Sequence, residues 1–248
     1  ARPLSAPTPT RVAIALNAVL AAVEDERPKV LCARGSSGAA GLPYGPFDPE
    51  RHRTFEIGIR EWVERQTTVS LGYVEQLYTF GDRGREAPAA ALLGGAASDR
   101  IVSVGYLALA REPAPVDDAA AAWRNWYDFF PWEDWRRGEP PVLAGGILPA
   151  LFDWADGAGD AAADRRARIR LAFGLDSDGW EEERTLDRYE LMYEAGIVAE
   201  AARNGDARPV DGAGAEMVSD HRRILATAIG RLRGKLKYRP VVFELTPP

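Results

Sequence analysis

Residues 54–68 read TFEIGIREWVERQTT, and the interpretation of the whole chain depends on this stretch. Its apolar residues recur at helical spacing and predict a core-facing stripe, made of Phe55, Ile59, Trp62 and Val63. The other face carries the charged residues Glu56, Arg60, Glu61, Glu64 and Arg65. Carboxylates one turn apart on a helix can hold a divalent metal. The stretch therefore predicts a working metal site, the remains of one, or a helix face held by salt bridges.

The segments around this helix predict a strand-rich first half and a helical second half. Strands are expected at 11–23, 29–34, 71–81, 101–111 and 240–245, and helices at 119–137, 141–156, 160–174, 180–203 and 217–236. Regular alternation of strands and helices is absent, and so are the G-x-G-x-x-G and P-loop motifs. A doubly wound dinucleotide-binding sheet is therefore not expected.

Composition narrows the class of protein. The 248 residues are 46% hydrophobic, which suits one large domain or two small ones with a real core. The single cysteine, Cys32, forbids a disulfide framework and fits a reducing cytoplasm, and with only His52 and His221 beside it a structural zinc site is not expected. We see no membrane span and no signal peptide, and therefore expect a cytoplasmic protein.

Charge is unevenly distributed along the chain. Residues 221–240 hold seven Lys/Arg and no acid, although the chain as a whole carries a net charge of −6. Such a segment indicates contact with nucleic acid or another anion, or else a solvated helix face bridged to acidic neighbours.

Several motifs together resemble the Nudix family. They are LPYGPF (42–47), IREWVERQTT (59–68), YVEQLYTFG (73–81) and IVSVGYLALA (101–110). More narrowly, YVEQLYTFG, SDHRRIL (219–225) and RLRGKLKYRPVVFEL (231–245) are similar to the Nudix-related transcriptional regulators of NAD metabolism. The resemblance implies an α+β fold: a Nudix-type α/β/α sandwich with a mixed sheet, plus an inserted helical segment.

The same resemblance implies a domain division and a set of partners. Residues 1–136 would form the Nudix-like domain, 137–216 a helical insertion, and 217–248 a basic helix and strand leading toward a winged-helix DNA-binding domain. The chain stops where that domain should begin, so we expect it to be largely missing here. The ligand implied is ADP-ribose or a related nucleotide, the DNA partner would be bound through the C-terminal domain, and the chain would form a homodimer.

The catalytic signature of the family is only half present. That signature is G-x5-E-x7-R-E-U-x-E-E-x-G-U, where U is a bulky apolar residue. Arg60, Glu61, Trp62 and Glu64 match it, whereas Arg65 replaces the second acid of the E-E pair. The other departures are Pro46 for the first glycine, His52 for the upstream glutamate, and Thr67 and Thr68 for the final glycine and apolar residue.

These departures weaken the site as a metal centre. Nudix chemistry uses Mg²⁺ or Mn²⁺ to neutralise phosphates and activate water. Glu61 and Glu64 could still share a metal, with Glu56 or Glu50 replacing a lost acid. A guanidinium at Arg65 would instead pair with Glu61 and repel a cation, and Arg60 is expected to pair with Glu64. We therefore expect no required cofactor and no catalytic residue, with Mg²⁺ at Glu61 and Glu64 only in an active enzyme.

A protein that has lost catalytic activity can keep its ligand-binding pocket, because a sensor benefits from binding a nucleotide without destroying it. Arginine forks suit diphosphate and aromatic rings can stack on adenine. The candidate ligand-binding residues are Arg34, Tyr44, Phe47, Arg60, Tyr78, Arg83, Arg85 and Arg100. The tryptophan-rich run 123–135 is interpreted as packing between sheet and insertion or as a dimer surface, with a ligand wall as the alternative, and His221 as a structural residue near a helix start.

Three functions follow from these observations. The first is a ligand-responsive transcriptional regulator whose Nudix-like domain binds without hydrolysis. The second is an active Nudix hydrolase of ADP-ribose or another nucleoside diphosphate derivative, using Glu61, Glu64 and Glu56. The third is a scaffold that binds a protein partner and no nucleotide.

Overall fold

The described strands of the protein form one mixed sheet, which decides where every other element lies. A computed structural model describes residues 12–34, 39–82, 100–116, 120–176, 179–205 and 207–238. The strands are β1 (Val12–Glu24), β2 (Arg27–Arg34), β3 (Ala40–Gly41), β4 (Tyr44–Pro46), β5 (Val74–Phe80), β6 (Arg100–Leu109) and β7 (Ala121–Asn125). Their order is β3-β2-β1-β6-β5, with β4 paired to β1 and β7 paired to β2.

The centre of the sheet is a long parallel pair. Residues Val12–Ala21 of β1 lie in register with Arg100–Leu109 of β6, while the other pairings are antiparallel. Both strands are buried on both faces along most of this length, which explains their continuous apolar sequence. Strand β5 lies antiparallel beside β6 and carries an irregularity between Gln76 and Tyr78.

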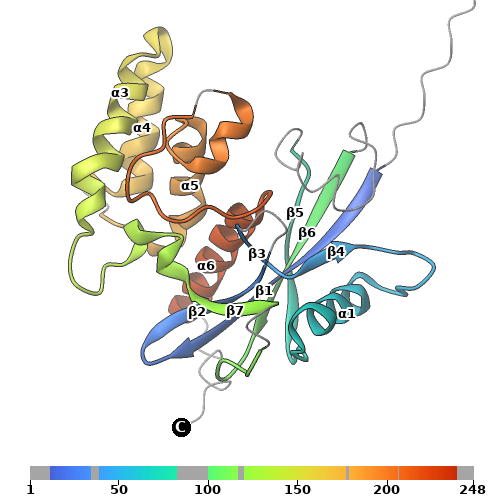
Figure 1. The fold of residues 1–248 in the computed structure, drawn as a ribbon. Coiled ribbons are helices and arrows are strands. Elements are labelled where there is room, and N and C mark those ends of the chain that lie inside the picture. Colours follow the sequence, from blue (N-terminus) through green and yellow to red (C-terminus); the bar gives the residue numbers. More distant parts are fainter. Residues whose placement is uncertain are drawn as a thin grey trace, which may run out of the picture.

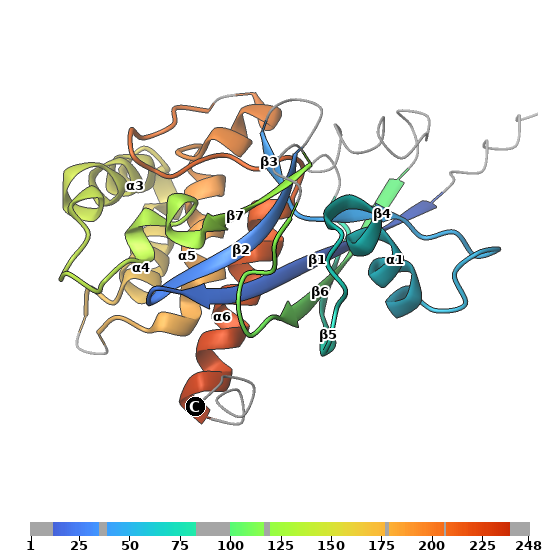
Figure 2. The same ribbon diagram turned by 60° about the horizontal axis from the view of Figure 1, so that its bottom comes forward.

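Helices cover both faces of the sheet. Helix α1 (Phe55–Thr67) packs on one face, where Ile59 and Val63 meet Leu16, Leu20 and Val104. Helix α6 (His221–Tyr238) crosses the opposite face, together with a layer formed by α3 (Leu148–Asp156), α4 (Ala162–Phe173) and α5 (Thr185–Glu194). Figures 1 and 2 show α1 on one side of the sheet and these four helices on the other. This arrangement is the expected α/β/α sandwich with a mixed sheet.

One hydrophobic core joins the sheet to the helical layer. Val19, Leu77 and Phe80 from the sheet belong to the same buried cluster as Ile224 of α6 and Tyr189 of α5. The close contact between α6 and β6 depends on Gly105, because a Cβ there would lie 3.1 Å from Ile224 Cγ2. The tryptophan-rich run packs into this core through Trp132, Phe129 and Phe130, as the packing interpretation predicts.

Two predicted helices differ in the structure. Residues 119–137 contain β7 and two 3-10 turns, Trp126–Asp128 and Pro131–Glu133, because residues 121–125 pair with β2. Residues 180–203 contain a 3-10 turn (Glu182–Arg184), α5 and a second 3-10 segment (Ala199–Asn204). The interruption follows α5 at Gly196, whose φ of +75° is a left-handed conformation that ends a helix.

The remaining helices begin or end close to the predicted positions. The segment predicted at 141–156 contains a π-helical turn (Leu143–Ile147) before α3, and a short 3-10 turn (Gly159–Ala161) precedes α4. The predicted strand at 240–245 lies outside the described residues. No helix in the described part of the chain is both long and apolar enough to cross a lipid bilayer.

Candidate functional site

The candidate site is the charged face of α1, which its flanking segments hold firmly against the sheet. Thr54 caps the helix by accepting a hydrogen bond from the Ile57 amide at 3.2 Å. The Trp62 indole donates to the Pro46 carbonyl at 3.0 Å, and the Gln66 side chain makes two hydrogen bonds with the backbone of Tyr44. A Cβ at Gly45 would lie 2.1 Å from the Trp62 ring, so the sequence needs glycine there for β4 to approach α1.

Glu61 occupies the centre of this face and is surrounded by basic groups. Its carboxylate lies 2.6 Å from the Arg51 guanidinium and 3.6 Å from that of Arg65. The Nε2 atom of His52 is 3.3 Å from the other carboxylate oxygen, and His52 itself is buried. The predicted pair between Glu61 and Arg65 is therefore present, and His52 stands beside Glu61 where the family signature has an acid.

The predicted pair between Arg60 and Glu64 is wrong. Arg60 turns toward the helix N-terminus and pairs with Glu56 through two hydrogen bonds of 3.0 and 2.8 Å. The reason is the segment before β5, because its Leu71 and Gly72 carbonyls accept hydrogen bonds from the same guanidinium. Arg60 thus ties α1 to the chain that enters the sheet.

These contacts decide how well the face could hold a metal ion. Mg²⁺ requires several hard oxygen ligands in near-octahedral geometry. The Glu61 oxygens already contact basic groups and Glu56 is paired with Arg60, while Glu64 and Glu50 are exposed. Within the described residues, no three His, Cys, Asp or Glu side chains lie close enough to bind one ion. The donor set does not fit a resident Mg²⁺ unless Arg51 and Arg65 move away.

The aromatic candidates for ligand binding lie in different surroundings. Tyr44 on β4 packs edge-on against His221 of α6, with ring centroids 4.9 Å apart, and burial raises the pKa of its phenol. Phe47 packs edge-on against Phe55 at 4.6 Å. Tyr78 on β5 is 61% exposed and meets the Phe80 ring edge-on. The three rings thus pack against three different partners: Tyr44 against His221, Phe47 against Phe55, and Tyr78 against Phe80.

Among the arginine candidates other than Arg60, the structure describes the side chain of Arg100 alone. Arg100 begins β6 and donates to the Gly81 carbonyl at 2.6 Å, which places it at the end of β5. Arg34 ends β2, but its side chain lies outside the described part of the structure, as do Arg83 and Arg85. The set of ligand-binding candidates therefore stays a prediction.

Helix α6 is basic in sequence but largely neutralised in the structure. Its basic side chains form ion pairs with acids elsewhere in the chain: Arg222 with Glu200, Arg223 with Asp82 and Glu190, Arg233 with Glu133, Lys235 with Glu75, and Lys237 with Glu183. These contacts support the interpretation of a helix face bridged to acidic neighbours. His221 is buried and its Nδ1 accepts a hydrogen bond from the Leu42 amide at 2.9 Å, as a structural role predicts.

The structure also contains a buried ion-pair network that the sequence did not predict. Glu133 receives two hydrogen bonds from Arg188, at 2.6 and 3.0 Å, and another from Arg233. Arg188 and Glu133 are fully buried at their side chains. The three residues are far apart in sequence, so no spacing rule could have joined them.

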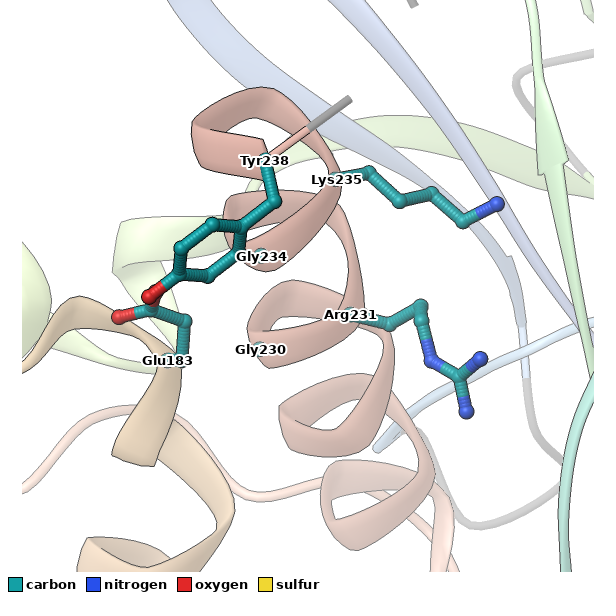
Figure 3. Close-up of a pocket in the computed structure, with 6 residues that line it drawn as sticks. All are labelled: Glu183, Gly230, Arg231, Gly234, Lys235 and Tyr238. Carbon is teal, nitrogen blue, oxygen red and sulfur yellow. The ribbon is translucent and has the colours of Figure 1, made fainter. Parts of the chain in front are cut away.

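Two hollows lie away from α1. One, of about 540 Å³, lies beside α6 and is lined by Glu183, Gly230, Arg231, Gly234, Lys235 and Tyr238. Figure 3 shows Glu183 and Tyr238 on one side of this helix, with Arg231 and Lys235 projecting on the other. The second, of about 260 Å³, lies in the helical layer between Trp135, Phe173 and Trp180. The sequence pointed to neither hollow, although the tryptophan-rich run includes Trp135.

Comparison with known proteins gives structural neighbours only. No family model matches the chain, and none of the curated proteins matches it. Its fold is similar to the Nudix domain of Shewanella oneidensis NrtR complexed with ADP ribose, with 25% identity over 50% of this chain and 79% of that chain and a TM-score of 0.40. A MutT/nudix family protein from Enterococcus faecalis matches with 23% identity over 49% of this chain and 47% of its own, at a TM-score of 0.38.

A longer match is to S. oneidensis NrtR complexed with a 27mer DNA. It covers 83% of this chain and 98% of that chain, with 19% identity and a TM-score of 0.38. The solved structures that this chain is similar to thus include Nudix proteins, the family that its sequence motifs resemble.

Proposed function

We propose that this chain is a Nudix-like sensor that binds ADP-ribose or a related nucleotide without hydrolysing it, in a transcriptional regulator of NAD metabolism. The observation that carries the proposal is the state of Glu61. The acid that the Nudix signature uses for metal lies between Arg51 and Arg65, with His52 in place of a further acid. The motifs at 42–47, 59–68 and 73–81 supply the link to the family.

The charges on this face favour a diphosphate over a metal ion. Arg51 and Arg65 are each more than half exposed at their side chains, so both can leave Glu61 for a ligand at small cost. Guanidinium groups bind phosphate oxygens through paired, charge-assisted hydrogen bonds. The same two charges repel Mg²⁺. An arginine in place of one metal ligand, together with Arg51 beside it, thus makes this surface better suited to binding an anion than to holding a metal ion.

Regulation of transcription and homodimerisation rest on the resemblance of residues 73–81 and 219–245 to the NAD regulators. Contact with DNA is assigned to the winged-helix region that this resemblance implies. It is not assigned to α6, because five of the basic side chains of this helix are paired with acids of the same chain.

A calorimetric titration with ADP-ribose in the presence of Mg²⁺ tests the proposal. We expect heats that saturate and ADP-ribose that is recovered intact by chromatography. Sustained heat with release of AMP and ribose 5-phosphate, abolished by Glu64→Gln, would identify an active hydrolase instead. Absence of any binding would favour the scaffold function.

A second experiment asks whether Arg65 blocks metal binding. Arg65→Glu restores the second acid of the signature beside Glu61 and Glu64, so we expect Mn²⁺ to bind more tightly than in the wild type. Mn²⁺ electron paramagnetic resonance measures the bound fraction. The matched control is Arg65→Gln, which removes the positive charge but adds no ligand. Equal Mn²⁺ affinity in all three proteins would show that Arg65 is not what excludes the metal.

A further inference from the structure

The hollow in the helical layer has an unusual lining. Its walls come from the segment after the second 3-10 turn, the start of α3, the end of α4 and the stretch before α5. Aromatic and aliphatic side chains make up most of the surface, through Trp135, Leu143, Phe173 and Trp180. One ionisable side chain lines it, the carboxylate of Glu139. The volume of about 260 Å³ is below that of a typical site for a drug-sized molecule.

Three aromatic rings of this hollow pack together, and one of them, Trp180, also contacts a cation. The Trp135 and Trp180 ring centroids are 4.7 Å apart, and Phe173 meets Trp180 edge-on at 6.3 Å. The Arg188 guanidinium lies 3.8 Å from the Trp180 ring centroid, and its charge is balanced by Glu133. Trp135 is 37% exposed, so part of its ring is open to a ligand.

The charge of the lining selects the class of ligand. An anion would find no basic side chain in the wall and would be repelled by Glu139. A strongly hydrated metal ion would find a single carboxylate among apolar groups. A cation with an apolar surface gains both from the carboxylate and from the negative faces of the rings. Glu139 is exposed and has no ion pair among the described residues, so its charge is available.

We propose that this hollow binds a small organic cation of the alkylammonium class, with its charge toward Glu139 and its alkyl groups against Trp135 and Phe173. This site is separate from the nucleotide-binding face of α1, and it excludes the phosphates that the proposed sensor function requires. Its success or failure is therefore independent of that proposal.

Indole N–H resonances in ¹H–¹⁵N spectra provide the test, with choline as the probe. We expect saturable shifts of the Trp135 and Trp180 indoles as choline rises into the tens of millimolar, at constant ionic strength. The Trp62 indole on α1, which donates to Pro46, should not move. Trp135→Phe assigns one resonance by its disappearance.

Two comparisons make the result decisive. The uncharged analogue 3,3-dimethylbutan-1-ol has the same shape, and we expect it to bind at least threefold more weakly. Glu139→Gln should weaken choline binding by roughly threefold to tenfold while leaving the alcohol unchanged. The control Glu216→Gln makes the same charge change at an exposed position outside the lining and should have no effect.

The outcomes that overturn the proposal are equally specific. Equal affinity for choline and for the alcohol would mean that the hollow recognises only apolar shape. Shifts that do not saturate, or that spread to Trp62, would mean non-specific contact. Unchanged choline affinity in Glu139→Gln would remove the carboxylate from the site.

Discussion

At the residue scale, a buried ion pair is the feature on which the stability of this protein depends most clearly. The Glu133 carboxylate and the Arg188 guanidinium are fully buried and bonded to each other in a two-point contact. Removing Arg188 would break this buried pair and leave Glu133 in the interior with Arg233 as its remaining basic partner, which is strongly destabilising. Surface pairs of the same chemistry contribute little, because water and salt screen them.

Arg188→Met should therefore lower the free energy of unfolding by about 3–5 kcal/mol. Urea denaturation followed by circular dichroism measures the loss. The matched control is Arg166→Met, which breaks the half-exposed pair with Asp156 and should cost less than about 1 kcal/mol. Equal costs for the two variants would contradict the view that burial makes the Glu133 network important.

The buried thiol of Cys32 predicts how the stability of the folded state depends on pH. Burial raises the pKa of its thiol to about 12, from an ordinary value of 9.0. The folded state thus keeps the thiol proton where the unfolded state has lost it. The stability from this group is complete below about pH 9 and falls as the pH rises from there toward 12.

Between pH 9 and pH 10 the wild type should lose about 1 kcal/mol of stability relative to Cys32→Ala, because the thiol of the unfolded chain is already half ionised at pH 9. Urea denaturation of both proteins at the two values measures the difference, and the variant corrects for other groups that titrate there. Parallel pH dependence in the two proteins would show that the thiol ionises as easily in the folded state.

Glycine spacing on α6 provides a comparison at the scale of the element. Gly230 and Gly234 lie one turn apart on the same helix. A Cβ at Gly230 would lie 2.6 Å from the Glu183 carbonyl oxygen, whereas one at Gly234 would meet only the Glu183 side chain, at 3.7 Å. The first glycine is required by the close approach of a neighbouring backbone, and the second is not.

Gly234→Ala should stabilise the protein by roughly 0.5–1 kcal/mol, because alanine restricts the unfolded chain and favours the helix. Gly230→Ala should destabilise it, since the carbonyl of Glu183 belongs to the backbone and cannot turn aside. Thermal unfolding of the two variants and the wild type measures these opposite changes in stability. A stabilised Gly230→Ala protein would mean that α6 can shift away from residue 183 at no cost.

The sequence predicted the elements that carry their own pattern. Strands β1 and β6 are continuous apolar runs and α1 has an apolar stripe at helical spacing, so local signals sufficed. The helix predicted over 119–137 is wrong at β7, because residues 121–125 pair with β2, about ninety residues earlier in sequence. Local propensity could not reveal that pairing.

In the candidate site, too, contacts within one helix could be predicted and contacts between separate segments could not. The pair between Glu61 and Arg65 follows from one helical turn and was predicted. The partner of Arg60 was missed, because the Leu71 and Gly72 carbonyls decide it and they lie beyond the helix. His52 contacts Glu61 only through the turn that precedes α1, which no helical spacing describes.

At the scale of the whole molecule, the sheet and the helical layer share one core. Buried residues of β1, β5 and β6 contact the same cluster as those of α5 and α6. Two ion pairs join these layers further, Arg223 of α6 with Asp82 after β5 and Lys235 of α6 with Glu75 on β5. The boundary expected near residue 136 from the family resemblance thus has continuous packing on both sides of it.

We therefore expect the chain to unfold in one cooperative transition. Tryptophan fluorescence reports mainly on the helical layer, where Trp132 and Trp180 lie, and far-ultraviolet circular dichroism reports on all the secondary structure. The urea midpoints from the two probes should coincide. Separate midpoints would identify the helical layer as an independently stable unit.

The parallel pairing of β1 with β6 has a consequence for folding during synthesis. Val12 pairs with Arg100, so β1 leaves the ribosome well before its parallel partner and cannot complete its pairing until the residues between them have been synthesised. The hairpin of β1 and β2 can close early, because its partners are adjacent in sequence. The central pair closes a long loop and belongs to the slow steps of folding. Until α6 arrives and covers Gly105, the middle of the sheet stays open to water, and to any chaperone that recognises exposed apolar strands.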